Sequence, residues 1–236
     1  DVQNIGVLIK LSGLLPKGFE LAPYLREVRN QLHEETNYAI EAAHLRRFHT
    51  LLADVPHFIL PRIHEDWSTP SILAMEYVGG ISIEEVAALS KEERDQVAKH
   101  LIVLTLKELF EFGVMQTDPN FANYRYQPDT RRIVLLDFGA TREIAPTVVD
   151  QYRRLIRAGL LNDDGALMEL AQGIGFFSAQ TSSSHRHQIF KMMQLVFDAL
   201  TAQEKFEFSD KTIAKQLQAD GFALIEDGFI PTPLPI

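Results

Sequence analysis

The sequence contains no cysteine, so disulfide bonds, thiol catalysis and cysteine-ligated zinc are excluded. No apolar run approaches the roughly 18 residues that a membrane-spanning helix requires. Basic residues are in the minority, with 23 Lys and Arg against 32 Asp and Glu, and an acidic chain predicts no nucleic-acid partner. The histidines lack zinc-site spacing, and no G-x-S-x-G nucleophile elbow occurs.

The composition that remains is typical of a folded protein. The 236 residues are 46% hydrophobic, which is enough for the core of one large domain or of two small lobes. The first residue is Asp1 rather than Met, so we expect the chain to be a piece of a longer protein.

Helices and one hairpin are predicted in the first part of the chain. Apolar residues recurring at threes and fours favour helices over 2–15 and 22–52. Two segments rich in β-branched and aromatic residues, His57–Ile63 and Ser71–Tyr77, predict the strands of a hairpin, and Gly79-Gly80 then breaks the pattern.

The remainder is predicted to be helical around a small group of strands. Ser90 and Glu93 form a capping box before a strongly apolar helix over Lys91–Phe112, which we expect to be mostly buried. Residues 122–136 predict two short strands, and the second is a buried run that ends at Asp137. Further helices are predicted over 147–159, 164–173, 184–203 and 210–219.

Two polar motifs follow these buried elements. Asp118 and Asn123 match the D-x-x-x-x-N part of a kinase catalytic loop, and Asp137 opens the Asp-Phe-Gly of the kinase metal-binding motif. Phosphoryl transfer needs Mg²⁺ held by carboxylate and amide oxygens, and a carboxylate that receives a proton or places the nucleophile. Asp118 is therefore the candidate catalytic residue, and Asn123 and Asp137 are the candidate metal ligands.

Turn and cap chemistry is the alternative for either motif alone, because Asp and Asn favour loops. The two aspartates are 19 residues apart (137 minus 118), one after a helix and one after a strand. This combination of order, spacing and context favours the metal site over the alternative.

An apolar strand that runs into glycines precedes these motifs, at Leu73–Gly80. In a two-lobed kinase this segment is the hinge, whose backbone bonds the edge of adenine. Met75 would lie at the back of the nucleotide pocket, and Glu76 and Val78 would present the hinge carbonyl and amide. An ordinary edge strand and turn is the other interpretation.

Glu41 lies in the first long helical pattern, ahead of the hairpin. Kinases hold the phosphate-binding lysine with a helix-borne glutamate, and Glu41 is suitably placed for that role. A solvated helix charge is the alternative.

Together these motifs resemble the UbiB family of atypical protein-kinase-like proteins. The resemblance covers roughly residues 1–230 and is most specific in Phe112–Asn123 and Leu135–Glu143, where Gln-Thr-Asp-Pro replaces the His-Arg-Asp of ordinary kinases. The family's Lys-x-Gly-Gln helix, its alanine-rich phosphate loop and the strand with the ATP-contacting lysine do not occur in this sequence.

The resemblance implies roles for individual residues. Asp118 would be the catalytic-loop aspartate and Glu41 the partner of the nucleotide lysine, while Asn123 and Asp137 would hold the metal. The family's helix motif is matched at Glu35 and at Glu41-Ala42, whereas Asn stands at position 37, where Asp is usual.

The predicted fold is α+β and protein-kinase-like, dominated by a helical C-lobe. Residues 1–78 are predicted to form a partial N-lobe, and residues 79–236 a C-lobe with the catalytic loop and the Asp-Phe-Gly motif. The resemblance implies an atypical kinase or ATPase that binds ATP or ADP with Mg²⁺ and supports ubiquinone (coenzyme Q) biosynthesis. The alternatives are a pseudokinase-like scaffold or lipid-binding partner, and a small-molecule phosphotransferase of the choline or aminoglycoside type.

The expected partners are adenine nucleotide and, by resemblance, membrane lipid or coenzyme Q precursors and biosynthetic enzymes. The Phe-rich segments Gly175–Phe177 and Phe190–Phe197 are interpreted as helical core, with a lipid-binding surface as the alternative. The expected location is cytoplasmic or peripheral to the inner membrane in a bacterium, and the mitochondrial matrix side in a eukaryote.

Overall fold

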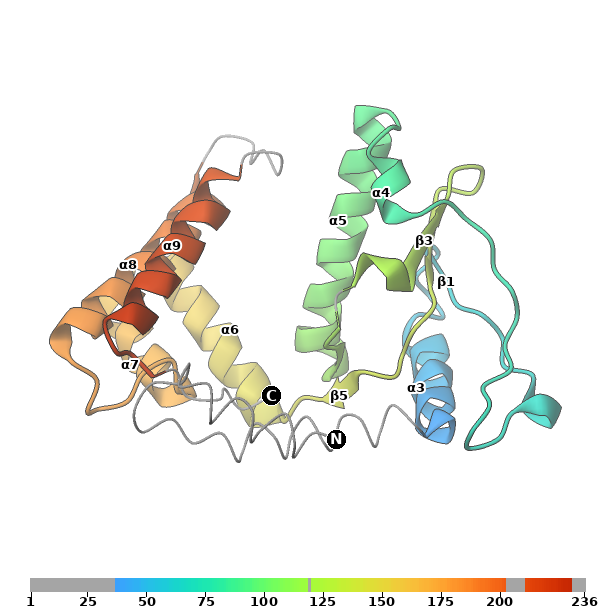
Figure 1. Ribbon diagram of the computed structural model, residues 1–236, viewed down its shortest axis with the longest axis horizontal. Coiled ribbons are helices and arrows are strands. Elements are labelled where there is room, and N and C mark those ends of the chain that lie inside the picture. Colours follow the sequence, from blue (N-terminus) through green and yellow to red (C-terminus); the bar gives the residue numbers. More distant parts are fainter. Residues whose placement is uncertain (1–36, 119, 203–210, 231–236) are drawn as a thin grey trace. The chain divides into compact units, whose positions relative to one another are not determined.

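The structure is a computed structural model, and it describes residues 37–118, 120–202 and 211–230. These residues fall into two compact units, which meet in the sequence between Ile144 and Ala145. The first unit runs from blue to yellow and the second from yellow to red (Figure 1). The helix predicted over 2–15, residues 22–36 of the 22–52 pattern and Glu35 lie outside the described residues. The lobe boundary predicted after residue 78 stays a prediction.

Helix α3 (Tyr38–Leu51) opens the described chain. Asn37 is its N-cap, because the Asn37 side chain accepts a hydrogen bond from the Ala39 amide at 3.2 Å. The single helix predicted over 22–52 is therefore wrong at this point, since residue 37 is a non-helical cap. The buried face of α3 carries Leu45 and Phe48, and the Phe48 ring lies 5.1 Å from the ring of Phe138.

A three-stranded sheet forms the centre of the first unit, in the order β1-β4-β3. The strand β1 (Phe58–Ile59) runs parallel to β4 (Arg132–Leu135), and β4 is antiparallel to β3 (Tyr124–Gln127). Ile133 and Val134 of β4 are fully buried. The strand pair predicted within 122–136 is confirmed. Its second strand, β4, is the central strand of the sheet and is the buried run that leads to Asp137.

The predicted hairpin of His57–Ile63 with Ser71–Tyr77 forms only in part. Ile63 pairs with Met75 in an isolated antiparallel bridge, but regular strand is limited to β1, which pairs with β4 instead. Pro61 lies between β1 and this bridge, and proline has no amide hydrogen for a ladder. A 3₁₀ turn, Glu65–Trp67, occupies part of the connection.

Helix α4 (Ile83–Val86) begins with the capping box of Ser82 and Glu85, and α5 (Lys91–Lys107) follows it. A π-helical turn, Glu108–Phe112, extends α5 to Gly113, which adopts the left-handed conformation. The predicted extent of the helix is confirmed, but its predicted burial is wrong. Val97, Leu104 and Glu108 are buried, whereas other apolar residues are exposed: Ile102, Val103 and Leu106.

A two-stranded ladder completes the first unit. Strand β2 (Val114–Gln116) pairs antiparallel with β5 (Thr141–Glu143), and Gln116 lies opposite Thr141. This pairing joins the two ends of the 114–143 segment. The catalytic-loop motif and the Asp-Phe-Gly motif both lie within it.

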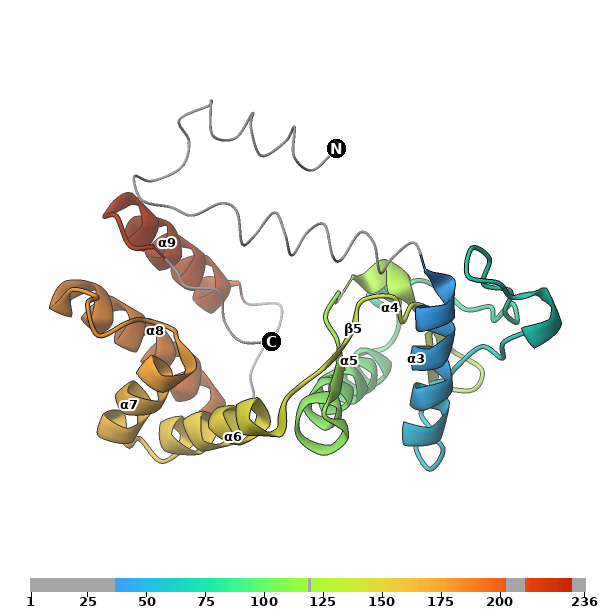
Figure 2. The ribbon, with the colours of Figure 1, turned by 90° about the horizontal axis from the view of Figure 1, so that it is seen from below.

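The second unit is helical (Figure 2) and comprises α6 (Pro146–Leu160), α7 (Asp164–Ile174), α8 (Ser183–Thr201) and α9 (Thr212–Glu226). The four predicted helices are confirmed, and α9 continues past the predicted end at residue 219. None of the described helices is long and apolar enough to cross a membrane.

Candidate nucleotide and metal site

The antiparallel pairing of β3 and β4 brings the two polar motifs together. Tyr124 lies opposite Leu135, and the Leu136 amide donates a hydrogen bond to the Asn123 carbonyl at 3.0 Å. Asn123 ends a 3₁₀ turn just before β3, and Asp137 follows β4. The two predicted metal ligands therefore stand at the same end of the strand pair.

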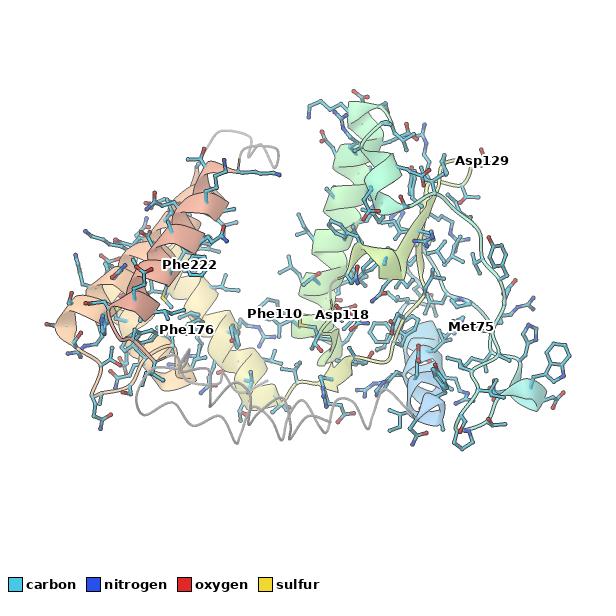
Figure 3. The ribbon with its side chains drawn as sticks, in the orientation of Figure 1. Met75, Phe110, Asp118, Asp129, Phe176 and Phe222 are labelled. Atoms are coloured by element: carbon cyan, nitrogen blue, oxygen red, sulfur yellow. The ribbon has the colours of Figure 1, made fainter. Side chains whose placement is uncertain are left out.

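Asp118 joins this group from the other side of the catalytic loop, and its position is labelled in Figure 3. The Asn123 side-chain amide donates to Asp118 Oδ2 at 3.4 Å, which leaves the Asn123 side-chain oxygen available. Asp137 Oδ1 accepts from the Gly139 amide at 2.9 Å, which leaves the second carboxylate oxygen available. One amide oxygen and one carboxylate oxygen remain, and these are ligands that Mg²⁺ prefers.

The donor set fits Mg²⁺ better than a transition metal. Among the described residues no group of three or more His, Cys, Asp or Glu side chains could hold a metal ion. Mg²⁺ retains several waters and takes one or two protein ligands plus phosphate oxygens, so a two-residue set is adequate. Asn123 and Asp137 are the residues that would hold it.

Glu41 of α3 reaches the backbone of the Asp-Phe-Gly motif. Its carboxylate accepts from the Phe138 amide at 3.4 Å, and His44 of the same helix contacts the Phe138 carbonyl at 3.1 Å. The pKa of Glu41 is raised above its usual value, mainly by partial burial and further by the nearby Asp137 carboxylate. The hydrogen bond from the Phe138 amide acts in the opposite direction. No cation pairs with Glu41 within the described part of the chain, so its lysine partner stays a prediction.

Gln116 is a member of the site to which the sequence assigned no role. Its side-chain oxygen accepts from the Asp118 amide at 2.9 Å, and its side-chain nitrogen donates to the Asp137 carbonyl at 3.0 Å. Gln116 opens the Gln-Thr-Asp-Pro sequence and is the last residue of strand β2. The sequence could have indicated Gln116 as a site residue, because it is a polar side chain at the end of an apolar strand.

Glu108 is the second residue without a predicted role. It is buried in the π-helical turn, and its carboxylate accepts from the Gln116 backbone amide at 3.3 Å. Burial raises the pKa of Glu108 to about 7. A hollow of about 10 Å³, the size of one water molecule, is lined by Glu108, Gln116, Asn123, Tyr124 and Asp137 together with apolar side chains.

The predicted hinge borders a larger hollow of about 370 Å³. Met75, Glu76 and Val78 all line it, and Arg125 and Leu136 complete the wall from β3 and from the residue before Asp137. The hinge residues therefore share one hollow with the immediate neighbour of a candidate metal ligand. The volume falls in the range of small-molecule sites, about 300 to 1,000 Å³.

The backbone of the hinge retains hydrogen-bonding capacity. The Glu76 amide donates to the Arg62 carbonyl at 2.7 Å, and the Glu76 side chain pairs with Arg62 at 3.1 Å. The Glu76 carbonyl and the Val78 amide bond to no other described residue. These are the two groups that were predicted to meet adenine.

Gly80 keeps the hinge close to β3. A Cβ atom at this position would lie 2.8 Å from the Tyr126 carbonyl oxygen, so only glycine fits without displacement. Ile81 then pairs with Tyr126. The glycine predicted as a breaker therefore also permits the contact that fixes the hinge to the strand beneath it.

A separate apolar hollow of about 530 Å³ lies in the second unit. Helices α6, α8 and α9 wall it, and Phe176 and Phe197 from the two Phe-rich segments are among its lining residues. The other lining side chains are almost all aliphatic and include Met192 and Met193. Both Phe-rich segments thus contribute to the helical core and to an accessible apolar surface.

A family model for the ABC1 atypical kinase-like domain matches residues 1–171. The chain belongs to this family. The predicted resemblance to the UbiB type is confirmed, and the residues of the candidate site all lie within the matched region.

Individual relatives agree with the family. The rat protein named "Atypical kinase COQ8B, mitochondrial" is 32% identical over 99% of this chain, which covers 44% of the relative. The Saccharomyces cerevisiae protein named "Atypical kinase COQ8, mitochondrial" is 29% identical over 99% of this chain and 47% of the relative. The chain therefore spans less than half the length of these relatives.

A solved structure shares the fold. The complex of Rv3197 with erythromycin from Mycobacterium tuberculosis matches with a TM-score of 0.63 and 19% identity, over 95% of this chain and 62% of that one. This likeness supports the mixed α+β, mainly helical, kinase-like fold that the sequence predicted.

Proposed function

We propose that the protein is an atypical kinase or ATPase of the UbiB type, which binds ATP or ADP with Mg²⁺ and supports ubiquinone biosynthesis. The observation that supports this most directly is the convergence of Asp118, Asn123 and Asp137 beside the hinge hollow. At this hollow the Glu76 carbonyl and the Val78 amide bond to no other described residue. The ubiquinone role and a location on the matrix side or at the inner membrane belong to the same proposal. They rest on the family and on the mitochondrial names of the relatives.

In this proposal each residue of the site has a defined task. The Glu76 carbonyl and the Val78 amide receive the edge of adenine, and Met75 lies at the back of the pocket. Asn123 and Asp137 hold Mg²⁺, which neutralises phosphate charge when bound. Asp118 accepts a proton from the acceptor hydroxyl or orients water, and Glu41 fixes the phosphate-binding lysine.

The first test is Asp137→Asn in the full-length protein. We expect millimolar ATP with Mg²⁺ to raise the melting temperature of the wild type, because a ligand that binds only the folded state stabilises it. The variant should lose the Mg²⁺-dependent part of the shift, since an amide is a weaker ligand than a carboxylate. Thermal unfolding with ATP, with and without Mg²⁺, measures both.

The matched control is Asp129→Asn, the same change in the exposed β3–β4 turn, where it touches neither motif. This variant should keep the full shift. A wild type that shows no shift at millimolar ATP would rule out the nucleotide site, and a full Mg²⁺-dependent shift in Asp137→Asn would rule out that ligand.

A lipid-binding partner is the second candidate function. The apolar hollow of the second unit supports it, because its volume of about 530 Å³ and its lining of Met, Phe, Leu and Ile side chains suit a hydrocarbon chain. This candidate is compatible with nucleotide binding in the first unit.

A further inference from the structure

The side chain of Gln116 has only one orientation that fits its neighbours. The Asp118 amide can only donate a hydrogen bond, so the atom at 2.9 Å from it must be the Gln116 oxygen. The Gln116 NH₂ group then faces the Asp137 carbonyl at 3.0 Å, which can only accept. One buried side chain thus accepts from one loop and donates to the other.

These two hydrogen bonds link the two loops that carry the site. Asp118 and Asn123 belong to the catalytic loop, while Asp137 belongs to the loop after β4. The Asn123–Asp118 side-chain contact at 3.4 Å lies within the catalytic loop and does not reach Asp137. The Gln116 side chain joins the two loops, and it acts at the backbone of Asp118 and of Asp137.

The backbone of Gln116 is itself held at two points. Glu108 accepts its amide at 3.3 Å from the buried π-helical turn, and Thr141 lies opposite it in the β2–β5 ladder. The next residue is anchored too, because Thr117 donates through both its amide and its hydroxyl to the Ala140 carbonyl, at 3.0 and 2.7 Å. The bridging side chain therefore starts from a fixed backbone.

We propose that Gln116, supported by Glu108, is a positioning residue that sets the separation between the catalytic loop and the metal-binding Asp137. An uncharged amide suits this task because it offers an acceptor and a donor in one plane at every pH. Groups that orient metal ligands without touching the metal typically change metal affinity about 10- to 100-fold when they are altered. The inference rests on the proposed Mg²⁺-nucleotide function.

The decisive variant is Gln116→Glu, which keeps the shape and the acceptor for Asp118 but has no donor for the Asp137 carbonyl. We expect the Mg²⁺ concentration for half-maximal ATP-dependent stabilisation to rise at least about tenfold in the full-length protein. Gln116→His retains a ring N–H donor, and we expect it to restore at least half of the lost Mg²⁺ affinity, on a logarithmic scale. A Mg²⁺ titration at fixed ATP, followed by thermal unfolding, gives each midpoint.

Gln188→Glu is the control. Gln188 also donates its side-chain amide to a backbone carbonyl, that of Asp220 at 3.2 Å, but it lies in the second unit. Gln188→Glu should leave the Mg²⁺ midpoint unchanged, even if Gln188→Glu and Gln116→Glu both have a lower melting temperature without ligand. This separates loss of positioning from loss of stability.

The outcomes for the two proposals are distinguishable. A wild type without Mg²⁺-dependent ATP binding would overturn both the proposed function and this inference. In a second outcome the wild type shows the Mg²⁺-dependent shift with ATP, and Asp137→Asn loses it. If Gln116→Glu then has a Mg²⁺ midpoint within twofold of the wild type, only the positioning role is wrong. A Gln116→His midpoint no better than that of Gln116→Glu would also contradict the role of the donor.

Discussion

Glu108 is a single buried acid whose ionisation opposes stability. The residue is 5% exposed, and the one hydrogen bond of its carboxylate to the described chain is with the Gln116 amide. Burial of a carboxylate costs free energy unless it is well paired, so the folded state favours the protonated form. The pKa of about 7 expresses this cost.

The predicted consequence is a pH-dependent effect of Glu108→Gln. The pKa of Glu108 rises on folding from 4.5 to about 7, so ionisation costs nothing below pH 4.5 and its full cost above pH 7. Glutamine keeps an acceptor for Gln116 and removes the charge. We expect a gain in the free energy of unfolding of up to roughly 3 kcal/mol at pH 8, and almost none at pH 4.5.

Urea unfolding at the two pH values measures this difference. Glu111→Gln is the control, because Glu111 lies in the same π-helical turn but is exposed, and among the described residues its side chain pairs only with Lys107. Its effect should stay within about 0.5 kcal/mol at both pH values. Equal gains for Glu108→Gln at pH 4.5 and pH 8 would contradict the buried charge.

At the scale of elements, periodicity and caps were reliable guides. Pro146 starts α6, and the Ser90 cap starts α5 where the sequence predicted. The errors came from pairing and exposure. β1 pairs with β4 rather than across the expected hairpin, and part of the apolar face of α5 is exposed. The pairing of β1 and the exposure of α5 do not follow from the local spacing of residues, because both depend on which other element packs against them.

The packing of α6 on α8 gives a prediction at this scale. A Cβ atom at Gly159 would lie 2.3 Å from the Phe197 ring, so the two helices meet at a glycine. Alanine has the better helix propensity by about 1 kcal/mol, but overpacking at a tight contact costs about 1 to 3 kcal/mol. We expect Gly159→Ala to lower the free energy of unfolding.

Gly173→Ala is the matched change in α7, where a Cβ atom would meet nothing within 4 Å. It should raise stability by about 0.5 to 1 kcal/mol. Chemical unfolding of both variants tests the pair. If Gly159→Ala is also stabilising, the close contact with Phe197 does not exist in solution.

At the scale of the whole molecule, the two candidate functions place their residues in different units. The candidate nucleotide site belongs to residues 37–144, and the apolar hollow belongs to residues 145–230. If the proposed function holds, we expect Asp118→Asn in the full-length protein to lower ATP turnover at least about 100-fold, the usual scale for loss of a general base. It should leave binding to phospholipid vesicles unchanged.

Met193→Lys provides the opposite variant, because it places a charge in the apolar hollow. If the second unit binds lipid, this variant should co-sediment less with phospholipid vesicles. Its ATP turnover without vesicles should stay within twofold of the wild type. Unchanged turnover in Asp118→Asn would contradict its catalytic role. Unchanged vesicle binding in Met193→Lys would remove the support for the lipid candidate.

The sequence by itself determined which groups form the candidate site. Asp118, Asn123 and Asp137 could be chosen because their side-chain chemistry and their places after a helix and a strand are local properties. The hinge residues could be chosen for the same reason, since glycines after an apolar strand are visible in the chain.

Only the tertiary structure decided how these groups are connected. Gln116 touches Asp118 and Asp137 because β2 pairs with β5, and β3 with β4. Glu108 is a buried acid in the π-helical turn that contacts β2. Hydrogen bonds and desolvation depend on distances between segments that are far apart in the chain. A spacing pattern contains no such distance, whereas the packed sheet and helices set each one.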